Sequence, residues 1–429
     1  MPIAKTLLFA LAGSLLTCVF TAPLLAETAG SADAFVDSVG VNIHLHYSNT
    51  SYSDFPHVKQ ALKDLGVRHV RDGLVDTKWK DYYTRHNDLG SAGIKGLFIT
   101  APNESDDLLL DYPERMKQSF EGYEAPNEYD QSRDSNWPAT LSQFITRLNK
   151  TVKGDPNTSR FQVIGPSFTS QRSYQQMRGV CSFDFSNLHN YFGGRNPGTD
   201  GWGSNGYGSY AWNLSNASSA CPGKAVISTE TGYQTDPTLT QGISDEVAGK
   251  YLPRLLLEQW MHGIQRTYVY ELIDLPDMGS GDKAFGLVRS DFSQKPSYMA
   301  LMNLLHLLSD PGEAYTGKDF GFSLSGEVAD VQHVLLQKRD GTFFIALWIE
   351  KPGYNVNHKQ VVNVPTQNVT LQTDKAVAMV AHSFGTSGNV RVSALDLGTS
   401  HSLKLSDYVT VLEIDGLRPL PPVLHAVVH

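Results

Sequence analysis

Two short segments of the chain end a strand-like run with a glutamate. Residues 124–128 read EAPNE, and residues 227–232 read ISTETG. Two carboxyl groups that flank one glycosidic bond can hydrolyse it by double displacement, because one protonates the leaving oxygen while the other attacks the anomeric carbon. A pair of glutamates alone would say little, but Asn127 precedes Glu128, and both segments fall within a repeating pattern of strands and helices. Glu128 and Glu230 are therefore the candidate catalytic residues.

That pattern is an alternation of strand-like and helix-like segments over residues 27–310. Strand–helix units close into a barrel when they repeat eight times, which takes roughly 250 residues. A doubly wound open sheet would favour a glycine-rich turn after the first strand, whereas residues 44–49 read HLHYSN. We therefore predict a TIM (β/α)8 barrel of the α/β class. The expected strands lie within residues 35–46, 67–73, 95–101, 122–128, 161–167, 183–191, 225–230 and 267–273.

The pattern changes after residue 310, where apolar residues no longer recur at helical spacing. Short runs of strand character follow, separated by turn residues such as the Arg-Asp-Gly at 339–341. We predict a C-terminal antiparallel β-sandwich domain over residues 311–416. Residues 417–429 are rich in proline and are expected to form a loosely ordered tail.

Polar residues gather where the predicted barrel strands end. Barrel enzymes place their chemistry at the carboxyl ends of the strands, where eight loops converge. The strand interiors stay apolar, so this distribution predicts a polar pocket at one mouth of the barrel. The residues at these ends are Asn42, His44, His46, Arg71, Asn103, Asn127, Glu128, Ser167, His189, Tyr191, Glu230, Tyr270 and Glu271.

These motifs resemble those of glycoside hydrolase clan A. Residues 124–128 are similar to the clan's Glu-x-x-Asn-Glu at strand four, and residues 228–232 to its nucleophile motif at strand seven. Arg71 matches the arginine of strand two, and residues 189–191 match the His-x-Tyr of strand six. A barrel followed by a sandwich is most similar to the β-xylosidase-like branch, family 39. The chain departs from that branch after Glu128, which no proline follows, and at strand eight, which lacks the usual tryptophan.

The resemblance implies a retaining β-glycosidase. Glu128 would be the acid/base and must carry a proton before the first step, whereas Glu230 would be the nucleophile and must be ionised. Arg71 can hold it ionised through a charge-assisted hydrogen bond, and Tyr191 can donate a second bond. Asn127 can donate to the 2-hydroxyl group of the sugar. In a retaining site the two carboxyl groups lie about 5–5.5 Å apart.

Other residues at the strand ends and in the loops are expected to contact the sugar. These further candidates are Asn42, His44, His189, Tyr270, Glu271 and Trp202. His189 could equally be a hydrogen-bonding residue of the framework. Trp202 lies in a glycine-rich loop over residues 193–208, where its ring could stack on a sugar or pack the loop down.

Two other interpretations of the barrel remain open. His44 and His46 are spaced as in metal-dependent amidohydrolases, because side chains two apart on a strand share a face and can bind one divalent ion. His189 and Asp274 would complete part of that set, but residues 164–167 supply no histidine at the fifth strand. The second alternative is a non-catalytic glycan-binding barrel, and a transglycosylase would use the same two glutamates. We expect no metal and no other cofactor.

The composition of the chain limits its partners. Its 429 residues are 41% hydrophobic and 18% charged, with a formal net charge of −9. A chain of this length can bury a large core. The acidic balance disfavours nucleic acid and anionic membranes, so the expected partner is a poly- or oligosaccharide.

Residues 1–26 have the pattern of an export signal. Lys5 is followed by apolar or small residues up to Ala26, after which we expect cleavage, with an uncleaved membrane anchor as the alternative. No later run is long and apolar enough to span a bilayer. After cleavage two cysteines remain, Cys181 and Cys221, each just before a predicted strand. We predict that they form a structural disulfide rather than free thiols, in a secreted or periplasmic protein.

Overall fold

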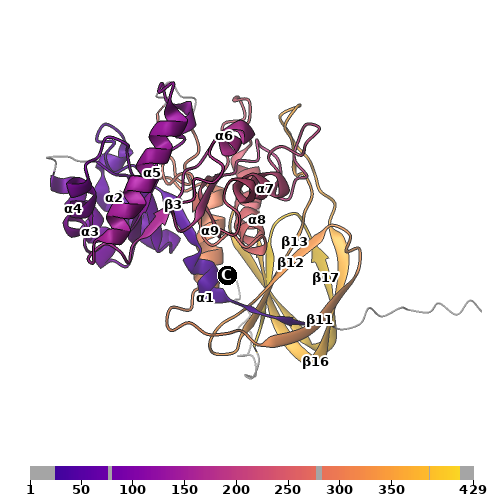
Figure 1. The fold of residues 1–429 in the computed structure, drawn as a ribbon. Helices are drawn as coiled ribbons and strands as arrows, with labels where there is room; N and C mark the ends of the chain where they lie inside the picture. Colours follow the sequence, from indigo (N-terminus) through magenta and orange to yellow (C-terminus); the bar gives the residue numbers. More distant parts are fainter. Residues whose placement is uncertain (1–24, 76–79, 277–282, 386, 416–429) are drawn as a thin grey trace, which may run out of the picture.

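The chain folds into a barrel of parallel strands surrounded by helices and a second domain of antiparallel strands (Figure 1). The structure is a computed structural model that describes residues 25–75, 80–276, 283–385 and 387–415. Most of the predicted signal peptide and all of the predicted tail lie outside these ranges, so both stay predictions. Within the described ranges no helix has the length and apolar character needed to cross a bilayer.

Eight parallel strands form the barrel. Each strand from β3 to β10 lies beside the next along the chain, and β10 pairs with β3 to close the ring. A parallel bridge between Ile164 and Phe185 joins β7 to the start of β8. The TIM barrel that the sequence predicts is therefore confirmed. The strands are β3 (Val39–Asn42), β4 (His69–Gly73), β5 (Lys95–Ile99), β6 (Phe120–Glu124), β7 (Gln162–Ile164), β8 (Ser186–His189), β9 (Val226–Thr231) and β10 (Thr267–Val269).

Helices cover the outside of the barrel. They are α1 (Ala32–Asp37), α2 (Phe55–Leu65), α3 (Lys80–Ser91), α4 (Asp106–Arg115), α5 (Trp137–Gly154), α6 (Gln171–Gln176), α7 (Tyr210–Ala220), α8 (Asp245–Met261) and α9 (Pro296–Leu308). Helix α7 was not expected from the sequence, because YAWNLSNASSA is rich in small polar residues and has no apolar face. Its start is set by Ser209, whose hydroxyl accepts from the backbone N–H of Trp212.

Helix α2 shows how these helices pack and end. Its buried residues Val58, Leu62 and Leu65 recur at intervals of three and four, so they share one face. The helix ends at Gly66, whose φ of 84° lies in the left-handed region that glycine enters without strain. A Cβ atom at Gly66 would lie 2.8 Å from the ring of His306, so α9 leaves no room for a side chain.

The inside of the barrel is filled by side chains. Leu97, Ile164, Ile227 and Tyr268 form an apolar cluster that is separate from the main core. Gly40 of β3 makes room for this cluster, because a Cβ atom there would lie 2.5 Å from the ring of Tyr268. The barrel is therefore a packed core with chemistry possible only at its mouths.

The second domain is an antiparallel sheet that bends round its own apolar core. Strands β16 and β17 shift register between Gln372 and Met379, and β16 pairs with β11 before this point and with β18 after it. The predicted antiparallel sandwich is confirmed. Its strands are β1 (Leu25–Thr28), β2 (Gly30–Ser31), β11 (Asp319–Gly326), β12 (Val331–Gln337), β13 (Phe343–Ile349), β16 (Gln367–Phe384), β17 (Val390–Leu405) and β18 (Thr410–Ile414).

The two strands that precede the barrel in sequence belong to this second domain. β1 pairs with β11, and β2 pairs with β12. Figure 1 shows the indigo segment running from α1 to β11. The expected barrel boundary at residue 27 does not account for this pairing, because strands of four and two residues carry too little alternation to assign to a sheet.

Helix α8 lies between the barrel and the second domain. Residues 247–259 are all buried, whereas a surface helix buries only one face. Its charged residues pair across the interface: Arg254 Nη2 lies 2.6 Å from Glu350 Oε1, and Lys250 Nζ lies 3.2 Å from Asp407 Oδ2. The second domain therefore completes the burial of a barrel helix.

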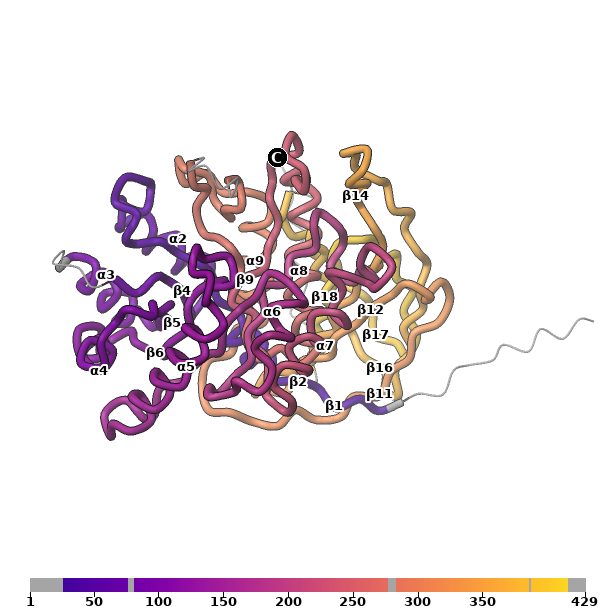
Figure 2. Tube along the Cα trace, turned by 45° about the horizontal axis from the view of Figure 1, so that its top comes forward, coloured from indigo at the N-terminus to yellow at the C-terminus, as the bar shows by residue number. Residues whose placement is uncertain are grey.

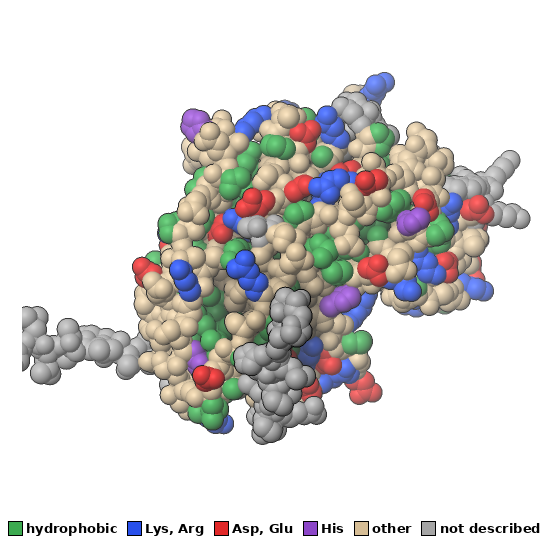
Figure 3. Space-filling model, turned by 180° about the vertical axis from the view of Figure 1, so that it is seen from behind, with side chains coloured by type: hydrophobic (Ala, Val, Ile, Leu, Met, Phe, Trp, Pro, Cys, Tyr) green, Lys and Arg blue, Asp and Glu red, His purple; other side chains and the backbone are tan. Residues whose placement is uncertain are grey.

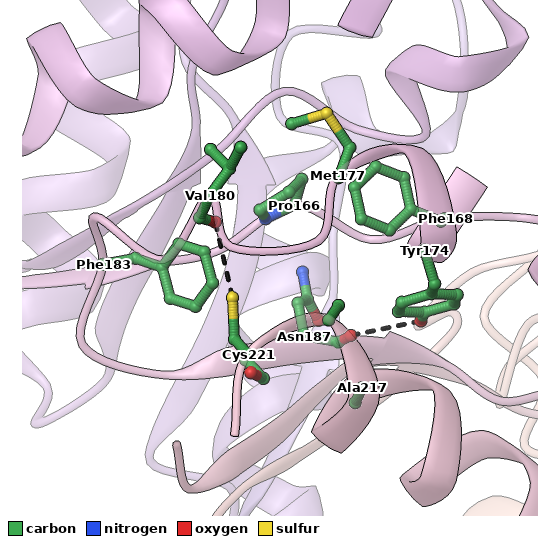
Figure 4. Close-up of a pocket in the computed structure, with 11 residues that line it drawn as sticks. Pro166, Phe168, Tyr174, Met177, Val180, Phe183, Asn187, Ala217 and Cys221 are labelled. Carbon is green, nitrogen blue, oxygen red and sulfur yellow. Dashed lines mark hydrogen bonds between the residues drawn. The ribbon is translucent and has the colours of Figure 1, made fainter. Parts of the chain in front are cut away.

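Cys181 and Cys221 form the predicted disulfide. They precede β8 and β9, so they lie at the opposite end of the barrel from the polar strand ends. Figure 4 shows the small cavity beside Cys221, with Phe168, Tyr174 and Phe183 around it. Its volume of about 20 Å³ and its apolar walls exclude a sugar.

Charged side chains are mixed on the surface. On the face in Figure 3, basic and acidic groups are interspersed among polar and apolar ones. The described residues of that face form no continuous basic stripe of the kind that nucleic-acid-binding proteins use.

Candidate active site

Arg71, on strand β4, is the centre of the polar site. Its Nε and Nη2 atoms donate to the two carboxylate oxygens of Glu124 at 2.6 and 2.8 Å. Nη1 donates to Glu230 Oε1 at 2.6 Å and to Asn42 Oδ1 at 2.8 Å, and Nη2 donates to Asn127 Oδ1 at 2.7 Å. Only 2% of Arg71 is exposed. Burial alone would lower the pKa of Arg71, but the charges of Glu124 and Glu230 outweigh burial and raise it.

The two asparagines that bind Arg71 differ in whether their side-chain N–H groups remain free for a ligand. Asn127 is exposed on the cavity wall, and because its Oδ1 accepts from Arg71, its amide N–H groups remain for another acceptor. Asn42 is 1% exposed and donates through Nδ2 to the carbonyl of Thr229 at 3.1 Å. Asn42 therefore supports the site from below, which differs from the sugar contact expected for it.

Glu230, in strand β9, is held in its ionised form. Besides Arg71, the hydroxyl of Tyr191 donates to Glu230 Oε2 at 3.0 Å. Burial would raise the pKa of Glu230, but the charges of His189 and Arg71 and these hydrogen bonds outweigh burial and lower it. Burial and the charge of Glu230 raise the pKa of Tyr191 well above its usual value, so the phenol stays a donor.

Glu128 lies in the turn after strand β6. The strand ends at Glu124, four residues before the end expected for it. The φ of Glu128 is 38°, in the left-handed region, which costs a non-glycine residue about 1 kcal/mol. Backbone of this kind collects at functional sites. Its side chain is 30% exposed and turns toward His189.

His189, at the end of β8, is bonded on both of its nitrogens. Nδ1 lies 2.8 Å from Glu128 Oε1, and Nε2 lies 3.0 Å from Thr229 Oγ1. The Thr229 hydroxyl is also 3.0 Å from Glu124 Oε1 and 2.9 Å from Asn187 Oδ1, which are both acceptors. The hydroxyl must donate to one of these, so it accepts from the Nε2–H of His189. Nδ1 is therefore the ring nitrogen that faces Glu128.

The two candidate carboxylates face each other at the same mouth of the barrel. One carboxylate oxygen from each of Glu128 and Glu230, and a ring nitrogen of His189, all lie within 4.8 Å of one another. Of the described residues, only these three form a group compact enough to hold a metal ion. The guanidinium of Arg71, 2.6 Å from Glu230, opposes a cation there.

A cavity of about 470 Å³ opens beside these groups, within the usual range for small-molecule sites. Among the residues that the sequence predicts, the cavity brings together Arg71, Asn127, Glu230, His44 and Tyr270. Tyr47 also lines it and stacks on His44 with ring centroids 4.7 Å apart. Tyr47 was not among the site residues expected from the sequence, although its place in the polar turn after β3 is a signal for a residue of the cavity wall.

Glu271 lies beneath the cavity and not on its wall. Its side chain is fully buried, and Oε2 lies 3.1 Å from His44 Nε2. Burial raises the pKa of Glu271 to about 7, although His44 acts to lower it. Glu271 therefore supports His44 from behind, which differs from the sugar contact expected for it. Tyr270, one residue earlier, lies on the wall.

Trp202 packs the glycine-rich loop onto itself. The guanidinium of Arg195 lies 4.2 Å from its ring, and the ring of Tyr207 lies 5.0 Å away. A Cβ atom at Gly208 would lie 2.2 Å from the indole. Of the two roles expected for Trp202, these contacts favour packing of the loop over stacking on a sugar.

The ring centroids of His44 and His46 lie 6.2 Å apart on the cavity wall, but the residues of the alternative metal site do not form one compact ligand group among the described residues. His46 Nδ1 lies 3.1 Å from Asp72 Oδ1, whereas His44 pairs with the buried glutamate below it. Asp274 lies 2.7 Å from Lys295. Each residue of that set therefore has a different partner. None of them, except His189, belongs to the compact group that could hold a metal among the described residues.

Similarity to known proteins lies in the fold and not in the sequence. No family model matches the chain, and no curated protein matches it. A family 39 glycoside hydrolase from the gut symbiont Bacteroides cellulosilyticus WH2 superposes with a TM-score of 0.60 at 17% identity, over 89% of this chain and 82% of that one. The chain therefore shares its fold with this glycoside hydrolase.

Two further solved structures share this glycoside hydrolase fold. A monomeric β-xylosidase from Caulobacter crescentus CB15 has a TM-score of 0.58 at 14% identity, over 91% of this chain and 98% of that one. An endo-β-1,6-glucanase has a TM-score of 0.51 at 13% identity, over 88% and 91%. The coverage spans barrel and second domain, so the layout expected from the resemblance to family 39 is confirmed.

Proposed function

We propose that this protein is an exported β-glycosidase that cleaves poly- or oligosaccharide with retention of configuration, with Glu230 as nucleophile and Glu128 as acid/base. The proposal is carried by the closeness of their carboxyl groups, since one oxygen of Glu128 lies within 4.8 Å of one oxygen of Glu230. Retaining enzymes keep these groups about 5–5.5 Å apart, whereas inverting enzymes need about 6.5–9.5 Å to admit a water molecule. The short distance favours direct attack on the sugar.

In the first step Glu230 attacks the anomeric carbon while Glu128 protonates the leaving oxygen. The lowered pKa of Glu230 keeps its carboxylate ionised at neutral pH. Arg71 and Tyr191 fix its orientation through hydrogen bonds of 2.6 and 3.0 Å. Glu128, whose Oε1 lies 2.8 Å from His189 Nδ1, delivers the proton to the leaving oxygen.

In the second step Glu128 acts as a base. The new glycosyl bond removes the negative charge of Glu230, so repulsion between the two carboxylates ends and Glu128 can stay ionised. Water enters where the leaving group departed, loses a proton to Glu128 and attacks the anomeric carbon, and the bond between that carbon and Glu230 breaks to release the Glu230 carboxylate. Arg71 meanwhile stays paired with Glu124 at 2.6 and 2.8 Å, so no unpaired buried charge arises.

The cavity wall supplies groups that suit a polyhydroxylated ligand. The free amide N–H groups of Asn127 can donate to the 2-hydroxyl next to the reacting carbon. The stacked rings of His44 and Tyr47, with Tyr270 beside them, offer polar edges and an aromatic surface for the sugar ring.

Labelling by a 2-fluoro glycoside tests the proposal. Such a compound forms the glycosyl-enzyme but releases it slowly, because the fluorine destabilises the oxocarbenium-like transition state. A screen of aryl β-glycosides first identifies the sugar, and peptide mass spectrometry should then find that sugar on Glu230. A label on another residue, or inverted configuration in the first product seen by NMR, would refute the proposal.

A substitution at Glu230 provides the second arm of this test. Glu230→Ala should lose roughly 10⁴-fold or more in kcat on every substrate, as expected for removal of a nucleophile. Glu114→Ala is the matched control, because Glu114 is an exposed glutamate of α4 that does not line the cavity. Retained activity in Glu230→Ala would defeat the assignment.

Export is part of the proposal. Residues 1–26 have the composition of a signal peptide, and a disulfide such as Cys181–Cys221 persists in oxidising compartments. Expression with the natural N-terminus should place a chain shortened by about 26 residues in the periplasm or the medium. A chain of full length held in the membrane would contradict it.

A further inference from the structure

A groove of about 550 Å³ lies between the glycine-rich loop and the second domain. It shares no lining residue with the catalytic cavity. Its second wall is formed by residues 351–365, which include the hairpin of β14 (Tyr354–Asn355) and β15 (Gln360–Val361). Figure 2 shows this hairpin standing out from the second domain.

The loop side of the groove is held in place by Glu350 of the second domain. Glu350 Oε1 accepts from Asn196 Nδ2 at 2.7 Å and from the backbone N–H of Gly198 at 3.0 Å. Glu350 is itself 6% exposed and is bound by Arg254 at 2.6 Å and by Trp348 Nε1 at 2.8 Å. These bonds fix the wall before any ligand arrives, which reduces the entropy that binding must overcome.

The hairpin side is held by contacts to the barrel. The backbone N–H of Gly353 donates to the hydroxyl of Tyr251 in α8 at 2.7 Å, and Lys359 Nζ donates to the carbonyl of Thr238 at 2.9 Å. A Cβ atom at Gly194 would lie 2.9 Å from Val356 Cγ1, so loop and hairpin touch at this point. Both walls are therefore preformed.

Two polar groups of the groove have hydrogen-bonding capacity that the described residues leave unused. Tyr354 is 4% exposed, and its hydroxyl has no hydrogen-bond partner among the described residues. Arg195 donates to the carbonyl of Gly193 at 3.2 Å and stacks on Trp202. Burial lowers the pKa of Arg195, and no carboxylate of the described residues offsets this effect. In a chain with a net charge of −9, a half-buried cation without a counter-ion is an unused binding group.

We propose that the groove binds a sugar unit that carries a carboxylate, a uronate, within the same saccharide that enters the catalytic cavity; this rests on the proposed function. The planar guanidinium of Arg195 matches a carboxylate through two parallel hydrogen bonds. The free hydroxyl of Tyr354 can pair with a ring oxygen or a hydroxyl group. Val356 and Val362 present apolar surface to the C–H face of the sugar.

The groove lies within reach of the catalytic cavity along the chain. Arg195 follows Tyr191 by four residues, and four residues span at most about 14 Å. Tyr191 donates to Glu230. One oligosaccharide can therefore occupy both places, with its acidic unit in the groove and the bond to be cleaved between Glu128 and Glu230.

Titration calorimetry on the full-length mature Glu230→Gln variant tests the proposal without turnover. The probes are a β-linked oligoglucuronate and an oligogalacturonate, each beside its carboxyl-reduced neutral counterpart. At least one acidic saccharide should bind about tenfold or more tightly than its neutral counterpart, because hydrogen bonds to a charged group are the stronger ones. No preference for either acidic saccharide would overturn the proposal.

Substitutions in the groove assign the preference to its residues. Arg195→Gln, made in the Glu230→Gln background, should abolish the preference for the acidic saccharide. Tyr354→Phe should weaken the binding of acidic and neutral saccharides alike by a few-fold, which is about the effect of one neutral hydrogen bond. Arg172→Gln is the matched control, because Arg172 is an exposed arginine of α6 outside the groove. An unchanged preference in a folded Arg195→Gln variant would overturn the proposal.

Hydrolysis separates this proposal from the proposed function. A neutral aryl β-glycoside occupies only the catalytic cavity, so Arg195→Gln in the otherwise unchanged enzyme should hydrolyse it with the same kcat/KM and lose activity on the acidic oligosaccharide. Acid-selective binding without any hydrolysis would refute the proposed glycosidase function and support uronate binding in the groove. Hydrolysis without acid-selective binding would support the proposed glycosidase function and refute uronate binding in the groove.

Discussion

Nδ1 of His189 lies 2.8 Å from Oε1 of Glu128. The other ring nitrogen, Nε2, lies 3.0 Å from Thr229 Oγ1, so both ring nitrogens have a partner and the ring is held in place. The side chain of His189 is 2% exposed, so water does not compete for this arrangement. In the proposed reaction His189 is therefore a positioning residue for the acid/base glutamate.

A change at His189 should affect acid catalysis selectively. His189→Gln can keep a hydrogen bond to Glu128 but has no ring nitrogen that can take up or release a proton. We expect kcat/KM to fall by roughly 10²-fold for alkyl glycosides, which need a general acid, and much less for dinitrophenyl glycosides, which do not. Steady-state kinetics with both leaving groups, over a range of pH, measures the difference. Equal losses on the two substrates would indicate a structural role alone.

Removal of Glu128 should be rescued by a small anion. Glu128→Ala leaves space where the carboxylate stood, so azide can attack the glycosyl-enzyme without a base. Activity on dinitrophenyl glycosides should persist and should rise with added azide, and the product should be a β-glycosyl azide by NMR. Glu114→Ala, with its exposed glutamate on α4, should show no response to azide. An α-glycosyl azide, or no rescue at all, would contradict the role given to Glu128.

Tyr191 should control the acid limb of the pH profile through Glu230. The pKa of Glu230 lies below its ordinary value of 4.5, so the reactive carboxylate is present above that pH and is lost as the pH falls through the lower value. Tyr191→Phe removes one donor to the carboxylate, at 3.0 Å, so the pKa of Glu230 should rise. The acid limb of kcat/KM on dinitrophenyl glycosides should then move to higher pH. A limb that stays in place would show that the Tyr191 hydroxyl does not hold the charge of Glu230.

Ionisation of Glu258 should weaken the interface between the barrel and the second domain as the pH rises. Burial, followed by the charge of Glu350, raises the pKa of Glu258 from 4.5 to about 8. The folded protein thus keeps a proton that the unfolded chain releases, so this contribution to stability is complete below pH 4.5 and is lost as the pH rises toward 8.

Glu258→Gln removes that ionisation. The difference between the Tm of the variant and the Tm of the unchanged protein should therefore increase as the pH rises from 4.5 to 8. Thermal unfolding followed by circular dichroism measures the two curves. Glu246→Gln, at an exposed position of the same helix, should show no such trend. Parallel curves for Glu258→Gln would mean that Glu258 is ionised in the folded protein.

The barrel and the glutamate pair proposed to be catalytic could be predicted, because both depend on order along the chain. Parallel strands place their carboxyl ends at one mouth, so Arg71, His189 and Glu230 had to meet once eight strands were recognised. Glu128 was found by its motif, although it lies past the end of β6. Helix α7 and the first two strands were not found, because their sequences carry no strong periodicity.

The sequence by itself determined the fold class, the disulfide and the set of polar residues at one end of the barrel, since local periodicity and strand order are written in consecutive residues. Only the tertiary structure decided how deeply each side chain is buried and which residues it contacts. It placed Asn42 and Glu271 beneath the cavity and Tyr47 on its wall. It also joined Glu350 to the loop after β8. Burial and hydrogen-bond partners depend on side chains that arrive from distant segments, and alternation along a strand gives the side a residue faces but not how deep it lies.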